Sequence, residues 1–119
     1  MTSKELNLKL ITHLPELDYN YHQETSWQDG DETGSHVVYA DVLVPFIKEQ
    51  LLSENKEYLT KIFEYIEFLL EIEDEYANEV VSLSVLESLL FDEEVNNSLL
   101  LSFAKPKTIQ LVNEIVQSI

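Results

Sequence analysis

The feature that most constrains the fold is a run of apolar residues at helical spacing in the middle of the chain. Large apolar side chains recur three or four positions apart at Leu59, Ile62, Phe63, Ile66, Leu69 and Leu70. This spacing places them on one face of an α-helix. Tyr58, Tyr65 and Phe68 widen that face, so we expect the helix to lie between neighbours at the centre of the domain. Ser53 is the residue expected to cap it.

The N-terminal segment carries a helix start signal. Thr2-Ser3-Lys4-Glu5 reads as a capping box, which predicts a first helix through His13. Pro15 then opens a second short helix, in which Leu17 and Tyr21 are expected to face inward, with Tyr19 as a further candidate.

Two apolar stretches allow more than one interpretation. Residues 37–52 are predicted to be helical, with Pro45 kinking or restarting the helix, although a strand over 37–44 is the rival. The stretch 80–91 is predicted as two short helices divided near Ser82, with a second capping box at Ser84 to Glu87. Residues 81–85 also alternate as a strand would, and the pattern leaves that alternative open.

The C-terminal quarter is expected to hold two further helices. Asp92 is predicted to cap a short helix through Leu101, and Pro106 occupies the first turn of a last one. The apolar stripe of that last helix is expected at Ile109, Val112, Val116 and Ile119.

These patterns predict an all-α fold. The 119 residues suit one domain, and 45% of them are hydrophobic, which favours a packed core. We expect a single compact helical domain over 1–119 with about six to eight mostly antiparallel helices, as a bundle or a short helical-repeat-like arch. Both glycines fall in 26–35, which is predicted to be an exposed acidic loop.

Charge limits the possible partners. The chain has 23 acidic residues against seven basic ones, none of them arginine, for a formal net charge of −16. Such a surface repels nucleic acid and anionic membranes, and it attracts a basic protein. The alternative is that the acidity serves only solubility.

The candidate partner-binding residues form two acidic clusters. The first accompanies aromatic residues of the kinds that anchor protein interfaces, and it comprises Tyr21, Trp27, Asp29, Asp31 and Glu32. The second is Glu71, Glu73, Asp74 and Glu75, and every charged residue between Ile62 and Ala104 is acidic. The other interpretation of the aromatic residues is ordinary packing.

Catalytic and metal-binding motifs are not apparent. The run Asp29 to Gly34 resembles the first half of an EF-hand, but Ala40 stands where the closing glutamate should be. His13, His22 and His36 are not spaced as zinc ligands, and there is no cysteine. Glu64, Glu67 and Glu71 read as a solvated stripe rather than a general acid and base. We therefore expect no enzyme activity, no metal site and no cofactor.

Three stretches carry a family resemblance: residues 39–47, 62–70 and 81–90. Together they resemble small acidic bacterial immunity proteins of contact-dependent growth inhibition and related polymorphic toxin systems. The resemblance implies a cytosolic antitoxin that binds the C-terminal domain of a cognate toxin and blocks its active site. Nuclease toxins are common in such systems, with a ribonuclease favoured here. The alternatives are an acidic adaptor with a different basic partner and, third, a calcium-responsive or enzymatic domain.

The expected location is the cytoplasm. Residues 1–14 lack the apolar core of a signal peptide, and no run of about 18 apolar residues could span a membrane. We expect a monomer that binds one toxin.

Overall fold

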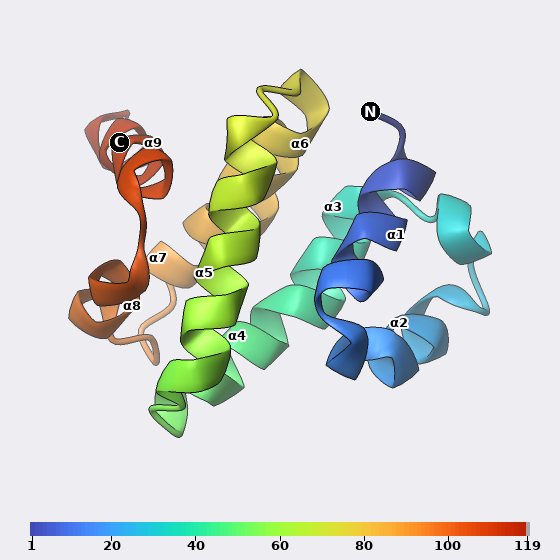
Figure 1. Ribbon diagram of the computed structural model, residues 1–119, viewed down its shortest axis with the longest axis horizontal. Helices are drawn as coiled ribbons and strands as arrows, with labels where there is room; N and C mark the ends of the chain where they lie inside the picture. Colours follow the sequence, from blue (N-terminus) through green and yellow to red (C-terminus); the bar gives the residue numbers. More distant parts are fainter. Residues whose placement is uncertain (119) are drawn as a thin grey trace.

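The computed structural model describes residues 1–118, and in that part of the chain the backbone forms seven helices and no strand, as Figure 1 shows. They are α1 (Ser3–His13); α2 (Asp18–Thr25), preceded by the 3-10 turn η1 (Pro15–Leu17); one helix made of α3 (Ser35–Val38), η3 (Tyr39–Leu43) and α4 (Val44–Leu52); α5 (Lys56–Glu71); one helix made of α6 (Glu75–Glu79), η4 (Val80–Leu86) and α7 (Glu87–Leu90); α8 (Asn97–Phe103); and α9 (Pro106–Gln117). The all-α prediction is confirmed, and both strand alternatives are wrong. No helix in this part of the chain is long and apolar enough to cross a membrane.

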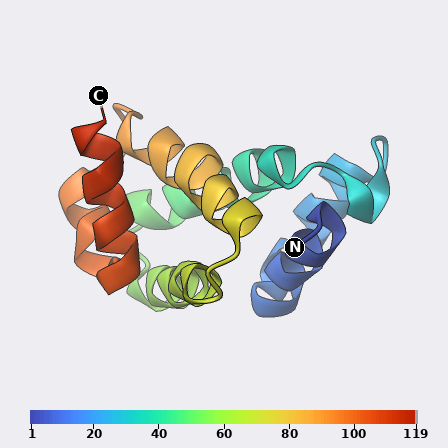
Figure 2. The ribbon, with the colours of Figure 1, turned by 90° about the horizontal axis from the view of Figure 1, so that it is seen from above.

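The helices form two layers closed at both ends. Figure 2 shows α1 and α5 in one layer and the helices 35–52 and 75–90 in the other. At one end α8 and α9 cover the layers, and at the other end α2 and the loop after it do so. Short connections make 35–52, α5 and 75–90 run in alternating directions, so the arrangement is a bundle.

The predicted central helix is central. Leu59, Ile62, Phe63, Ile66 and Leu69 on α5 are fully buried. Tyr65 joins this core through its hydroxyl, which lies 2.7 Å from that of Tyr39. The Tyr39 hydroxyl donates to the carbonyl oxygen of Leu6 at 2.8 Å, so the hydrogen bonds link α5, η3 and α1. Burial raises the pKa of both phenols, which therefore stay protonated at neutral pH.

Pro45 neither stops nor restarts its helix. Proline has no amide hydrogen, and in a regular helix its ring collides with the carbonyl four residues earlier. Here the preceding segment, η3, is a π-helix in which the amide of Val44 donates to the carbonyl of Tyr39. The wider turn moves the carbonyls away from the ring, and the helix continues from Ser35 to Leu52.

The predicted break near Ser82 is wrong. The backbone is helical from Glu75 to Leu90, with the π-helix η4 in the middle, so no capping box forms at Ser84. Valine and serine favour a helix only weakly, which is why the sequence suggested an interruption. Packing decides the outcome, because Val80, Val81 and Val85 are buried against neighbouring helices.

Two predicted caps are shifted along the chain. The capping box at Thr2 and Glu5 is present. However, Asn55, rather than Ser53, accepts from the amide of Tyr58 at 3.2 Å and caps α5. Asn96, rather than Asp92, caps α8 by accepting from the amide of Leu99 at 3.0 Å. In both cases asparagine lies directly before the first helical turn, where an N-cap must be.

Glu67 is not part of a solvated stripe. Its side chain is buried, and its carboxylate accepts from the amides of Lys107 and Thr108 at 2.9 and 3.0 Å and from the Thr108 hydroxyl at 2.9 Å. The carboxylate therefore caps the N-terminus of α9, where its charge complements the helix dipole.

This contact fixes the rotation of α9. Thr108, Val112 and Ile115 are buried, whereas Ile109 and Val116 are 40% and 55% exposed. The predicted stripe is thus correct at Val112 and wrong at those two positions, and Ile119 lies outside the described residues.

Candidate functional site

The acidic loop between α2 and α3 is held in place by Asn7 of α1. Asn7 is fully buried, and its Nδ2 donates to the carbonyl oxygens of Asp31 and Thr33 at 3.0 and 2.6 Å. Its Oδ1 accepts from the Ser35 hydroxyl at 2.8 Å. An asparagine side chain that donates to two loop carbonyls restrains the loop backbone, as hydrogen bonds from a neighbouring β-strand would. The loop is therefore rigid at its centre.

The loop also has internal hydrogen bonds. It contains one 3-10 turn, η2 (Gly30–Glu32), and Gly30 adopts φ 58°, in the left-handed region that favours glycine. The Thr33 hydroxyl donates to the carbonyl of Gly30 at 2.7 Å and accepts from the amide of Asp29 at 3.2 Å. Because Thr33 is buried, the prediction of a fully exposed loop over 26–35 is right only for part of the segment.

Tyr21 lies inside the molecule. Its ring is fully buried, and its hydroxyl donates to Asp31 Oδ1 at 2.7 Å. Burial, followed by the hydrogen bond to Asp31, raises the pKa of this phenol. Tyr21 thus cannot contact a partner in this conformation, and it holds the half-buried Asp31 side chain in place. Tyr21 and Asp31 therefore stabilise the loop from inside the molecule.

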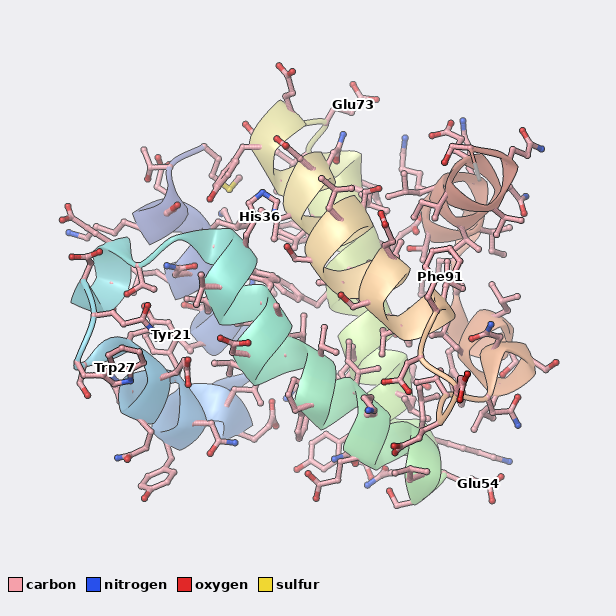
Figure 3. The ribbon with its side chains drawn as sticks, turned by 180° about the vertical axis from the view of Figure 1, so that it is seen from behind. Tyr21, Trp27, His36, Glu54, Glu73 and Phe91 are labelled. Atoms are coloured by element: carbon pink, nitrogen blue, oxygen red, sulfur yellow. The ribbon has the colours of Figure 1, made fainter. Side chains whose placement is uncertain are left out.

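The exposed residues of the first cluster are Trp27, Asp29 and Glu32. Figure 3 shows Trp27 at the edge of the molecule, further out than Tyr21, and its side chain is 73% exposed. Tyr19 of α2 is 72% exposed, so its expected inward position is wrong. Large exposed aromatic side chains beside carboxylates on a rigid backbone are typical of protein-binding surfaces.

A pair of carboxyl groups that the sequence did not single out lies between α2 and η3. Glu24 and Asp41 line a hollow of about 250 Å³ together with Asn20, Gln23 and Glu49. Desolvation, followed by the neighbouring charge of Asp41, raises the pKa of Glu24. Two carboxylates in proximity repel each other, and a cation placed between them would relieve that repulsion.

No lysine or arginine lies between Lys9 and Lys48, so with its histidines neutral this stretch, which includes α2, the loop and η3, carries only negative charges. This run is the sequence signal that could have identified Glu24 and Asp41. We call the exposed residues Trp27, Asp29 and Glu32, together with the carboxyl pair Glu24 and Asp41, the tryptophan surface.

The second acidic cluster lies elsewhere. Glu71, Glu73 and Glu75 are exposed around the turn between α5 and α6, and Figure 3 shows Glu73 far from Trp27. Asp74 is half-buried: it accepts from the amide of Ala77 at 2.9 Å and from the amino group of Met1 at 2.8 Å. The bond to Met1, then that to Ala77, lowers the Asp74 pKa. Asp74 therefore has a structural role as the cap of α6.

His36 belongs to a polar network between the two long helices. Its Nδ1 lies 2.6 Å from the Ser84 hydroxyl, and its ring meets the edge of Tyr76. The Tyr76 hydroxyl lies 2.8 Å from that of Ser3. Among residues 1–118, no carboxylate hydrogen-bonds to His36, so the serine and histidine lack the third group that orients a nucleophilic triad. The network joins α1, α3 and η4.

Comparison with known proteins places the chain in a family. The sequence model of one family, described as "Domain of unknown function (DUF7674)", matches residues 7–118. Neither the curated proteins nor the solved structures include a match. Since the matched segment covers nearly the whole helical domain, including Asn7 and the tryptophan surface, the chain belongs to the DUF7674 family.

Proposed function

We propose that the protein is an immunity protein that binds a basic toxin domain and blocks its active site. The toxin is a nuclease, with a ribonuclease favoured. The observation that carries this proposal is the tryptophan surface, where Trp27 stands 73% exposed beside carboxylates on a hydrogen-bonded loop. The resemblance of three core segments to immunity proteins supports the same function.

The chemistry of a nuclease explains why an acidic surface would inhibit it. A nuclease binds phosphates through lysine and arginine side chains in a groove, and a protein that presents carboxylates can occupy that groove in place of RNA. Asp29 and Glu32 supply such carboxylates on the tryptophan surface. Trp27 supplies the large apolar contact that interfaces of this kind concentrate in a few residues.

The carboxyl pair Glu24 and Asp41 favours a cationic partner for a second reason. Desolvation, followed by the charge of Asp41, raises the pKa of Glu24, so the charged form of Glu24 is disfavoured beside Asp41 in the free protein. A lysine or arginine side chain of the toxin, entering the hollow that the pair lines, would remove the repulsion between the two carboxylates. The rigid loop also reduces the entropy lost on binding, because its backbone is ordered beforehand.

Co-expression in a sensitive cell tests the proposal. The protein should restore growth when it is produced together with the toxin domain encoded beside it. Asp29→Lys with Glu32→Lys should reduce that protection, since both side chains are exposed. The matched control is Glu64→Lys with Glu114→Lys, which changes net charge equally at exposed positions on α5 and α9. If no neighbouring toxin is neutralised, the immunity function is wrong, and saturable binding to another basic protein would favour an adaptor.

A further inference from the structure

A second hollow lies beside α4 and shares Pro45 and Glu49 with the first. The helices 35–52 and 75–90 pack against each other through η3 and η4, and Figure 3 shows them running side by side. A groove of about 780 Å³ lies near their C-terminal ends, lined on the α4 side by Val44, Pro45 and Leu52.

The groove presents apolar surface to solvent. Leu52 at the end of α4 is 68% exposed, and Pro45, which also lines the groove, is exposed too. Apolar side chains gathered around a groove, rather than scattered singly, mark a site of contact with another molecule.

The charges around the groove are mostly negative. Its one lining lysine, Lys48, places Nζ 2.6 Å from Asp92 Oδ2. This hydrogen bond raises the pKa of Lys48 and lowers that of Asp92, so both groups stay charged and occupy each other. Within residues 1–118, neither Glu49 nor Glu94, which also line the groove, forms an ion pair.

The helix ends add to this field. Both long helices end beside the groove, at Leu52 and Leu90, and a helix C-terminus carries about half a negative charge. The groove therefore combines an apolar floor with a rim that attracts cations.

We infer that this groove binds an amphipathic basic helix of a partner protein, with aliphatic side chains against Val44, Pro45 and Leu52 and with lysines or arginines facing Glu49 and Glu94. A helix suits the site because the apolar face of a third helix can fill a groove beside two packed helices. The groove shares Pro45 and Glu49 with the hollow at Glu24 and Asp41, but Trp27, Asp29 and Glu32 do not line it, and the inference does not depend on the immunity function.

A designed peptide tests the inference directly. The probe is a fluorescently labelled helix of about 18 residues, five turns, with leucines on one face and lysines on the other. Two twins serve as controls: one has glutamates in place of the lysines, and the other has alanines in place of the leucines. Fluorescence anisotropy at about 0.15 M salt measures the affinity, and amide chemical shifts locate the peptide on the protein.

Only the leucine and lysine peptide should bind tightly, with shifts centred on residues 44–52 and 88–94. Leu52→Asn should weaken it roughly tenfold or more, because it removes a large apolar contact. Val116→Asn is the matched control, since Val116 is 55% exposed on α9, and it should leave the affinity unchanged. Circular dichroism should show the same helix content in both variants.

Several outcomes would overturn the inference. If the peptide with alanines in place of leucines binds equally well, charge alone drives binding. If the peptide with glutamates in place of lysines binds equally well, the acidic rim contributes nothing to binding. Affinity unchanged by Leu52→Asn would place the peptide elsewhere. A dimer in sedimentation velocity that Leu52→Asn dissociates would show that a second copy of the chain, and not a basic helix, occupies the groove.

Discussion

Replacing Asn7 with alanine should destabilise the protein and loosen the tryptophan surface together. The substitution removes three buried hydrogen bonds, to the carbonyls of Asp31 and Thr33 and from the hydroxyl of Ser35. Each contributes about 0.5–1.5 kcal/mol, so the loss is about 1.5–4.5 kcal/mol. Alanine regains up to about 0.7 kcal/mol as a better helix former within α1. The expected net loss is about 1–4 kcal/mol in the free energy of unfolding.

Urea unfolding followed by circular dichroism measures this loss, and hydrogen exchange of the Glu32 and Thr33 amides reports on the loop. These amides donate within the loop, to Asp29 and Gly30, and they should exchange faster in Asn7→Ala. Asn7→Asp should be at least as destabilising at neutral pH, because a carboxylate would face two carbonyl oxygens. Asn113→Ala on the exposed face of α9 is the control. A loss below about 0.5 kcal/mol, with unchanged exchange, would refute the role assigned to Asn7.

Three further predictions concern stability. Glu67→Ala should lower the free energy of unfolding by about 2–4 kcal/mol in a urea titration, because it leaves the buried Thr108 amide and hydroxyl without a partner. Glu67→Gln keeps one acceptor oxygen and should cost less, and a loss below about 1 kcal/mol for Glu67→Ala would contradict the capping of α9. Phe63→Ala should cost about 3–5 kcal/mol, since the ring is fully buried, and a change below about 1 kcal/mol would contradict the packing of α5. Glu24→Gln should gain stability relative to the wild type as the pH rises above 4.5, because deprotonation of Glu24 is disfavoured in the folded state. Below that pH the two proteins should have similar stability. Thermal melts across pH measure the difference, and a variant that loses stability relative to the wild type as the pH rises would contradict the prediction.

The presence of a helix could be predicted from the sequence where its apolar spacing or capping residues match the contacts that it makes in the fold. The spacing from Leu59 to Leu70 placed α5 in the core, and the capping box at Thr2 and Glu5 placed the start of α1. Local propensity failed where packing outweighs it. The valine- and serine-rich stretch around Ser82 suggested a break, yet burial of its valines keeps η4 within one helix.

Contacts between distant residues were beyond sequence reasoning. Glu67 has the spacing of an exposed glutamate stripe on α5. It is buried and acts as a cap only because α9, forty residues later in the chain, packs against it. The same holds for Asn7, which lies on α1 and meets the loop more than twenty residues further along. A polar residue inside a helix gives no local sign that a loop will cross it.

The candidate site was predictable in composition but not in geometry. Trp27, Asp29 and Glu32 are exposed, as expected of residues in a polar, glycine-containing loop. Tyr21 was grouped with them by sequence proximity, although α2 turns it inward to Asp31. Glu24 and Asp41 come from different helices and become neighbours only when α2 packs beside η3.

Binding of a basic toxin domain at the tryptophan surface can be measured as the dissociation constant between the purified protein and the toxin domain encoded beside it. Isothermal titration calorimetry gives this constant for the wild type and for Trp27→Ala. We predict a saturable 1:1 complex that Trp27→Ala weakens roughly thirtyfold, which corresponds to about 2 kcal/mol for a central aromatic contact. The absence of a complex, or an affinity that Trp27→Ala leaves unchanged, would contradict binding at this surface.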